Sequence, residues 1–175
     1  AICPDMNESG KLKLDKAENP LFTLSEKEVV PLNIELNEEK ILLLSGPNAG
    51  GKTVVLKSLG LYALMAQCGL FIPAYKAQFP IYTKFMADIG DRQSIEDDLS
   101  TFSAHIQNLA TIVEQANENT LILLDELGTG TDPDAGAALS RAIMESLIQK
   151  NCTVIATTHL GLLKVWASDE KGIIN

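Results

Sequence analysis

Short apolar runs alternate with longer amphipathic stretches along most of the chain, from Val29 onward. The apolar runs have the length and composition of strands, and they predict strands over residues 29–36, 41–45, 79–86, 121–125 and 152–157. Apolar positions at helical spacing predict helices over about residues 52–68, 100–116 and 132–151. Strands that alternate with helices of this length indicate an α/β fold with a largely parallel central sheet flanked by helices.

Residues 1–28 lack this pattern. They are polar, carry charges of both signs and contain the turn signal Asn19-Pro20, so we expect a lead-in segment with little regular structure. Residues 29–175 are then expected to form one domain. The chain starts at Ala1 rather than at a methionine, and we expect it to be a fragment of a longer protein.

Composition narrows the possible functions. Hydrophobic residues make up 46% of the chain, enough for a folded core, and the formal net charge is −9. This acidic balance argues against a stand-alone nucleic-acid binder, which needs clustered Lys and Arg to neutralise phosphates. Three widely spaced cysteines fit neither a disulfide framework nor a zinc cluster. No stretch has the roughly 18 consecutive apolar residues of a membrane span, so we expect a cytoplasmic location without membrane contact.

The strongest local signal is a phosphate-binding loop between the predicted strand at 41–45 and the helix that follows. The pattern G-x-x-x-x-G-K-[ST] is formed by Gly46, Pro47, Asn48, Ala49, Gly50, Gly51, Lys52 and Thr53. Backbone N–H groups of such a loop and the start of its helix cradle phosphates, so we expect ATP to bind here, with Val54 also at the site. Lys52 would reach the β and γ phosphates, and the Thr53 hydroxyl would bind Mg²⁺.

Two carboxylates follow the apolar run at 121–124. A buried strand delivers Asp125 and Glu126 to its carboxyl end, where ligands bind in open α/β sheets. We expect Asp125 to bind Mg²⁺ and Glu126 to activate the water that attacks the γ-phosphate. His159 ends the next buried strand and is expected to contact the γ-phosphate from the same edge of the sheet. The other histidine, His105, lies inside a predicted helix and is assigned a structural role.

Ser100 and Thr101 precede an apolar helical face, and their first interpretation is a helix cap. A capped helix N-terminus is also an anion site, so the same serine is a candidate contact to a phosphate supplied by another subunit. Both interpretations of Ser100 stay open at this point.

The chain resembles the ATPase domain of the MutS family, a branch of the ABC-type P-loop ATPases, in four segments: GPNAGGKT, SIEDDLSTFSAH, LLDELGTGTDP and ATTH. It is closer to the second type of MutS, the recombination-suppressing branch that often carries a Smr nuclease tail, in GGKTVVLKSLGL, GLFIPA and ADIGDRQSIEDDLSTFSAH. The resemblance covers about residues 29–175.

The resemblance implies an ABC-type P-loop NTPase fold and a homodimer in which two ATP molecules lie between head-to-tail subunits. Ser100 would then contact the partner's γ-phosphate, and residues 128–132 would line the dimer seam. Val29 and Val30, upstream of the loop, are candidates to hold adenine. The family acts on branched DNA or on collided ribosomes through regions outside this chain, and we find no nuclease motif here.

The sequence departs from the family at two places, Glu18-Asn19-Pro20, where a basic residue and a histidine usually precede the proline, and Leu160, where an aromatic residue is common. Three other functions are alternatives to ATP hydrolysis. A membrane-transporter ATPase needs Gly-Gly-Gln after its signature serine, and this chain has Thr101-Phe102-Ser103. A nucleotide-gated dimerisation module would have negligible turnover. A small-molecule kinase would need an arginine-rich lid, and Arg92 and Arg141 are the arginines of the chain.

Overall fold

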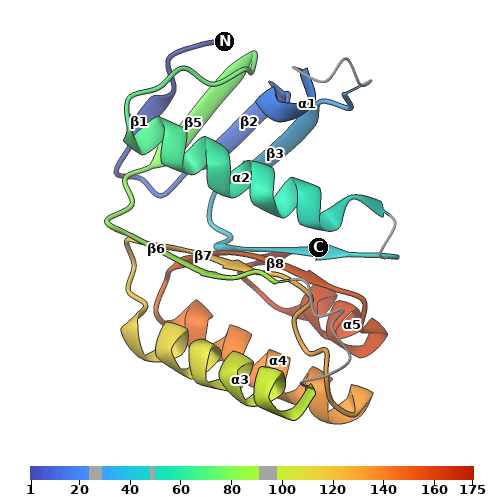
Figure 1. The fold of residues 1–175 in the computed structure, drawn as a ribbon. Helices are drawn as coiled ribbons and strands as arrows, with labels where there is room; N and C mark the ends of the chain where they lie inside the picture. Colours follow the sequence, from blue (N-terminus) through green and yellow to red (C-terminus); the bar gives the residue numbers. More distant parts are fainter. Residues whose placement is uncertain (24–28, 48–49, 91–97) are drawn as a thin grey trace. The chain divides into compact units, whose positions relative to one another are not determined.

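The computed structural model describes residues 1–23, 29–47, 50–90 and 98–175 (Figure 1). The chain forms two compact units. The first contains residues 1–38 and 57–82, and the second contains residues 39–56 and 83–175. Helix α2 (Lys52–Gln67) contributes its start to the second unit and its remainder to the first.

The first unit holds a four-stranded sheet in the order β1-β5-β2-β3. Its strands are β1 (Asp5–Asn7), β2 (Leu12–Ala17), β3 (Leu32–Leu36) and β5 (Lys76–Pro80). β2 is antiparallel to both β3 and β5, whereas β1 is parallel to β5. The short helix α1 (Pro20–Thr23) follows β2. Leu12 and Leu14 of β2 are buried together with Phe79 of β5 and Tyr62 of α2, so one face of this sheet supplies the core of the unit.

Three predictions for this part of the chain differ from the structure. Residues 1–28 contain β1, β2 and α1 rather than little regular structure. The single strand predicted over 79–86 is two strands in different sheets, because β5 ends at Pro80 and β6 (Lys84–Asp88) begins after a break. The strand predicted from Val29 begins only at Leu32, after Pro31, whose missing N–H cannot donate to a sheet.

The second unit is built on a five-stranded sheet in the order β6-β7-β8-β4-β9. Besides β6, its strands are β4 (Ile41–Ser45), β7 (Thr120–Leu124), β8 (Thr153–Thr158) and β9 (Ile173–Ile174). Each neighbouring pair is parallel, which confirms the predicted parallel sheet. Every residue of β8 is buried, as expected for a strand covered on both faces.

Helices α3 (Asp98–Gln115), α4 (Pro133–Gln149) and α5 (Gly161–Asp169) cover one face of this sheet (Figure 1). The helix predicted from residue 132 is confirmed, and Asp132 caps it, since its carboxylate accepts hydrogen bonds from the N–H groups of Asp134 and Ala135. α3 begins at Asp98, so Ser100 and Thr101 lie within its first turn and the prediction that one of them caps it is wrong. No helix in the described part of the chain is both long and apolar enough to cross a membrane.

Candidate functional site

The carbonyl oxygens of the loop between β4 and α2 bind the ammonium group of Lys52. Lys52 is the first residue of α2 and is 9% exposed, and its Nζ donates hydrogen bonds to the carbonyl oxygens of Gly46 at 2.7 Å and Pro47 at 2.9 Å. Gly46 and Gly51 have φ values of 144° and 77°, a region that residues with a Cβ rarely occupy. Gly50 N–H donates to Pro47 O at 3.0 Å. The ammonium is thus held at the start of α2, where an anion would also meet the helix N-terminus.

Two of the residues predicted at this loop, Asn48 and Ala49, lie outside the described residues. Gly46 and Thr53 are half-buried, whereas Pro47, Gly50 and Gly51 are exposed. Val54 is 39% exposed on the first turn of α2. Their roles in binding ATP stay predictions.

The predicted metal ligands lie together. Thr53 Oγ1 donates to Asp125 Oδ1 at 3.2 Å, although the two residues are far apart in the sequence and β8 lies between their strands in the sheet. Asp125 is 7% exposed. A hydroxyl and a carboxylate are oxygen donors of the kind that Mg²⁺ prefers. The described residues contain no group of three or more His, Cys, Asp or Glu side chains that could hold a metal.

Glu126 has an unusual backbone. Its φ is 52°, in the left-handed region, and the residue is half-buried directly after Asp125. Its N–H donates to Thr157 Oγ1 at 2.7 Å, and the next N–H, of Leu127, donates to Thr157 O at 2.8 Å. The turn after β7 is therefore fixed by the end of β8. A non-glycine residue in this conformation, beside a candidate metal ligand, is typical of a functional site.

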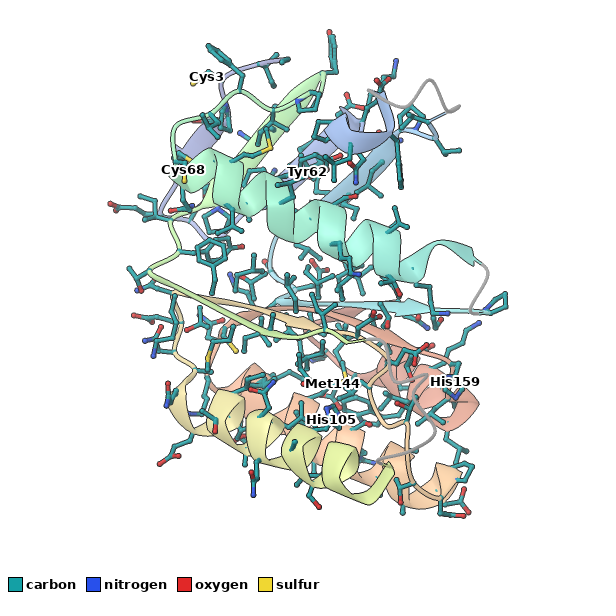
Figure 2. The ribbon with its side chains drawn as sticks, in the orientation of Figure 1. Cys3, Tyr62, Cys68, His105, Met144 and His159 are labelled. Carbon is teal, nitrogen blue, oxygen red and sulfur yellow. The ribbon has the colours of Figure 1, made fainter. Side chains whose placement is uncertain are left out.

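The other predicted contacts are more loosely placed. His159 is exposed directly after β8 (Figure 2), and its contact with a phosphate stays a prediction. Ser100 lies in the first turn of α3, and its predicted contact with a partner's phosphate is likewise untested. Val29 and Val30 belong to the first unit, and Val30 is 87% exposed.

Two neighbours of the site went unnoticed in the sequence. Thr157 is fully buried and its Oγ1 donates to Asp125 Oδ1 at 2.6 Å. A threonine at the end of an apolar strand is the signal that would have found it. Asp88, at the end of β6, accepts a hydrogen bond from Asp125 N–H on its carbonyl oxygen at 2.9 Å.

The Asp88 side chain connects the same point to α3. Its carboxylate accepts a hydrogen bond from Asn108 Nδ2 at 2.8 Å and pairs with His105 Nδ1. His105 is buried on α3 (Figure 2), which agrees with the structural role expected from its place in the helix. These contacts fasten the helix that carries Ser100 to the strand end next to Asp125.

Comparison with known proteins finds a matching family and several similar proteins. Residues 42–175 match the family described as MutS domain V. The chain is 50% identical to Endonuclease MutS2 of Caldicellulosiruptor saccharolyticus over 169 residues, which cover 95% of this chain and 21% of that protein. It is 46% identical to Endonuclease MutS2 of Clostridium botulinum over 175 residues, which cover 99% of this chain and 22% of that protein. The chain thus spans about a fifth of the length of these curated relatives.

Proposed function

The chain belongs to the MutS domain V family, with relatives in the MutS2 branch, and on that premise we propose that it is an ATP-binding and ATP-hydrolysing domain of the ABC type. The observation that carries the proposal is the approach of Thr53 to Asp125 beside the buried Lys52. The adjacent Lys52 and Thr53 supply an ammonium and a hydroxyl, and Asp125, 72 residues further along the chain, supplies a carboxylate at the same edge of a parallel sheet. That combination fits a nucleotide triphosphate with its magnesium ion.

Each residue has a distinct task in this proposal. The loop at 46–53 binds the phosphates through its N–H groups, and Lys52 exchanges its hydrogen bonds to Gly46 O and Pro47 O for phosphate oxygens. Thr53 and Asp125 hold Mg²⁺, which when bound neutralises charge on the phosphates. Glu126 accepts a proton from the attacking water. His159 is a candidate hydrogen-bond donor to the γ-phosphate, and Val29 and Val30 are candidates to contact adenine.

The proposed assembly is a head-to-tail homodimer in which Ser100 of one chain meets the γ-phosphate bound by the other. The full-length protein would use this domain to drive work on DNA structures, in suppression of recombination, or on stalled ribosomes. The relatives' name, endonuclease, favours DNA, and we assign no nuclease activity to residues 1–175. Stimulation of phosphate release by branched DNA or by ribosomes, measured on the full-length protein, distinguishes the two substrates.

Phosphate release and nucleotide binding by the chain test the ATPase proposal. Glu126→Gln should bind ATP as the parent does and lose nearly all turnover, because the amide keeps the shape but cannot accept the proton. Glu145→Gln, an exposed carboxylate on α4 that pairs with Arg141, is the matched control and should hydrolyse ATP normally.

Lys52→Ala should weaken ATP binding by about tenfold or more, since charge-assisted hydrogen bonds to phosphate are lost. Lys57→Ala, on the exposed side of the same helix, is its control. Parental turnover in Glu126→Gln, or parental affinity in Lys52→Ala, would refute the assignment. Tight ATP binding without magnesium-dependent turnover in the parent would favour the dimerisation module instead.

A further inference from the structure

One buried hydroxyl contacts both carboxylate residues of the proposed site. Thr157 lies near the carboxyl end of β8 and has no exposed surface. Its Oγ1 donates to Asp125 Oδ1 at 2.6 Å and accepts from Glu126 N–H at 2.7 Å. A hydroxyl has one proton to donate and lone pairs to accept with, so these two bonds use it in both directions.

The geometry follows from the register of the sheet. Leu124 of β7 pairs with Ala156 of β8, so Asp125, the first residue after β7, lies beside Thr157, which is still within β8. The same register brings Thr157 O to the N–H of Leu127 at 2.8 Å. Thr157 therefore contacts three consecutive residues after β7, and only its side chain reaches the first two.

The hydroxyl acts on two features that a catalytic site needs. At Asp125 it supplies the shorter of two hydroxyl contacts to Oδ1, the other being Thr53 at 3.2 Å, and so sets the direction of the carboxylate. At Glu126 it satisfies the N–H of a residue whose φ of 52° is unfavourable for a side chain. Without that acceptor, the Glu126 N–H would lose its partner in this conformation.

We propose that Thr157 is a positioning residue that fixes the magnesium ligand Asp125 and the water-activating residue Glu126 together through its hydroxyl. This inference rests on the proposed ATPase function. A partner that orients a metal-ligating carboxylate typically changes metal affinity by about 10-fold to 100-fold when it is removed. Replacement of Thr157 is thus expected to change the magnesium dependence and the turnover. It should not change nucleotide binding without metal, which depends on the loop at 46–53.

The neighbouring residue provides a matched control. Thr158 is also fully buried, and its hydroxyl donates to Leu127 O at 3.1 Å and accepts from Leu160 N–H at 3.1 Å. It therefore makes the same kinds of bond in the same strand, but its partners are Leu127 and Leu160 rather than Asp125 and Glu126. Replacement by valine at either position keeps the branched shape and removes one buried hydroxyl.

The experiment compares Thr157→Val, Thr157→Ser and Thr158→Val in the full 175-residue chain. ATP affinity is measured in EDTA and across a Mg²⁺ titration, together with kcat, KM and the unfolding midpoint. Thr157→Val should bind ATP in EDTA with the affinity of the parent. It should raise the Mg²⁺ concentration that gives half-maximal turnover by about tenfold, and lower kcat about tenfold with little change in KM. Thr157→Ser should restore the parent within about threefold, because it retains the hydroxyl.

Thr158→Val should lower the unfolding midpoint by about as much as Thr157→Val does, and it should leave the Mg²⁺ dependence of turnover unchanged. Equal effects of the two valine variants on Mg²⁺ dependence, or a Thr157→Val variant that behaves as the parent, would overturn the inference.

Hydrogen exchange at the Glu126 amide tests the positioning role without ATP. It should be slow in the parent, in Thr157→Ser and in Thr158→Val, and fast in Thr157→Val. Slow exchange in Thr157→Val refutes the role of the hydroxyl. A parent chain without magnesium-dependent binding or turnover refutes the proposed function instead, and the exchange result then decides the positioning role separately.

Discussion

The turn after β7 makes an unusually close contact with the start of α4, and a single methyl group should disrupt it. A Cβ atom added at Gly136 would lie 2.2 Å from the carbonyl oxygen of Gly128. The buried Ser140 hydroxyl, which donates to Gly136 O one helical turn earlier at 2.6 Å, would itself lie 2.6 Å from a Cβ at Gly128, so the turn and the helix are close from both sides. Gly136→Ala is therefore expected to push the turn and the helix apart.

The expected cost follows from that distance. A carbon atom and a carbonyl oxygen rarely approach closer than about 3.3 Å, so the two backbones must separate by roughly 1 Å. Overpacking of this kind costs about 1–3 kcal/mol, and the upper part of the range applies because no flexible side chain can turn away. Alanine gains up to about 1 kcal/mol over glycine inside a helix. The net loss of unfolding free energy should be about 1–2 kcal/mol.

Urea unfolding followed by circular dichroism measures this loss, with Gly161→Ala as the control. Gly161 is the first residue of α5, and a Cβ there would meet nothing within 4 Å. The control should be as stable as the parent or slightly more stable. If Gly136→Ala unfolds at the same urea concentration as Gly161→Ala, the contact between Gly128 and Gly136 is not the constraint that the distances indicate.

Three further outcomes are expected. In the full-length protein, Lys52→Ala and Ser100→Arg should each abolish phosphate release. Mixing the two variants should restore part of the phosphate release, because mixed dimers contain one intact site. No recovery despite confirmed mixed dimers would refute the shared site. Burial raises the pKa of the Cys152 thiol to about 11, so a thiol reagent at pH 8 should modify the exposed Cys3 and Cys68 and reach Cys152 only after unfolding, as counted by mass spectrometry. The hydrogen bond from Lys13, with a second from Lys11, lowers the pKa of Glu35 from 4.5 to about 2. The stability that this pairing adds is therefore present above about pH 4.5 and is lost as the pH falls towards 2. In an NMR titration of the carboxyl groups, the midpoint of Glu35 should rise towards 4.5 in Lys13→Gln.

Much of the second unit could be predicted because its signals are local. β4, β7 and β8 each contain an uninterrupted apolar run (ILLL, LILL and VIA), as expected for strands covered on both faces. Asp132 and Pro133 mark the start of α4 by themselves, since a carboxylate cap and a proline at the first position act within one turn. The residue types of the candidate site are likewise local, because the glycine loop and the Asp125-Glu126 pair are short segments.

The strands β1 and β2 of the first unit were not predicted, because their order depends on distant partners. β1 has three residues, and its partner β5 is about 70 residues away in the sequence. In β2 the buried Leu12 and Leu14 alternate with Lys13 and Asp15, a signal of period two that is short and mixed with charge. The apolar stretch from Phe79 to Met86 reads as one strand, yet its two ends pair in different sheets. Local pattern contains no information about that choice.

The geometry of the site depends on one further fact of topology, the position of β8 between β4 and β7. Thr53 follows β4 and Asp125 follows β7, so these residues meet only by reaching across the end of the strand between them. Whatever side chain ends β8 must then lie beside that contact, and it must satisfy buried polar groups there. Successive strand residues point to opposite faces, so only one of Thr157 and Thr158 can serve Asp125, and the other bonds to Leu127 and Leu160. A shift of β8 by one residue that put Ala156 in the place of Thr157 would leave both Asp125 Oδ1 and Glu126 N–H without the hydroxyl. The pairing register of β8 with β7, from Thr153 to Ala156, therefore helps to position Asp125 and Glu126.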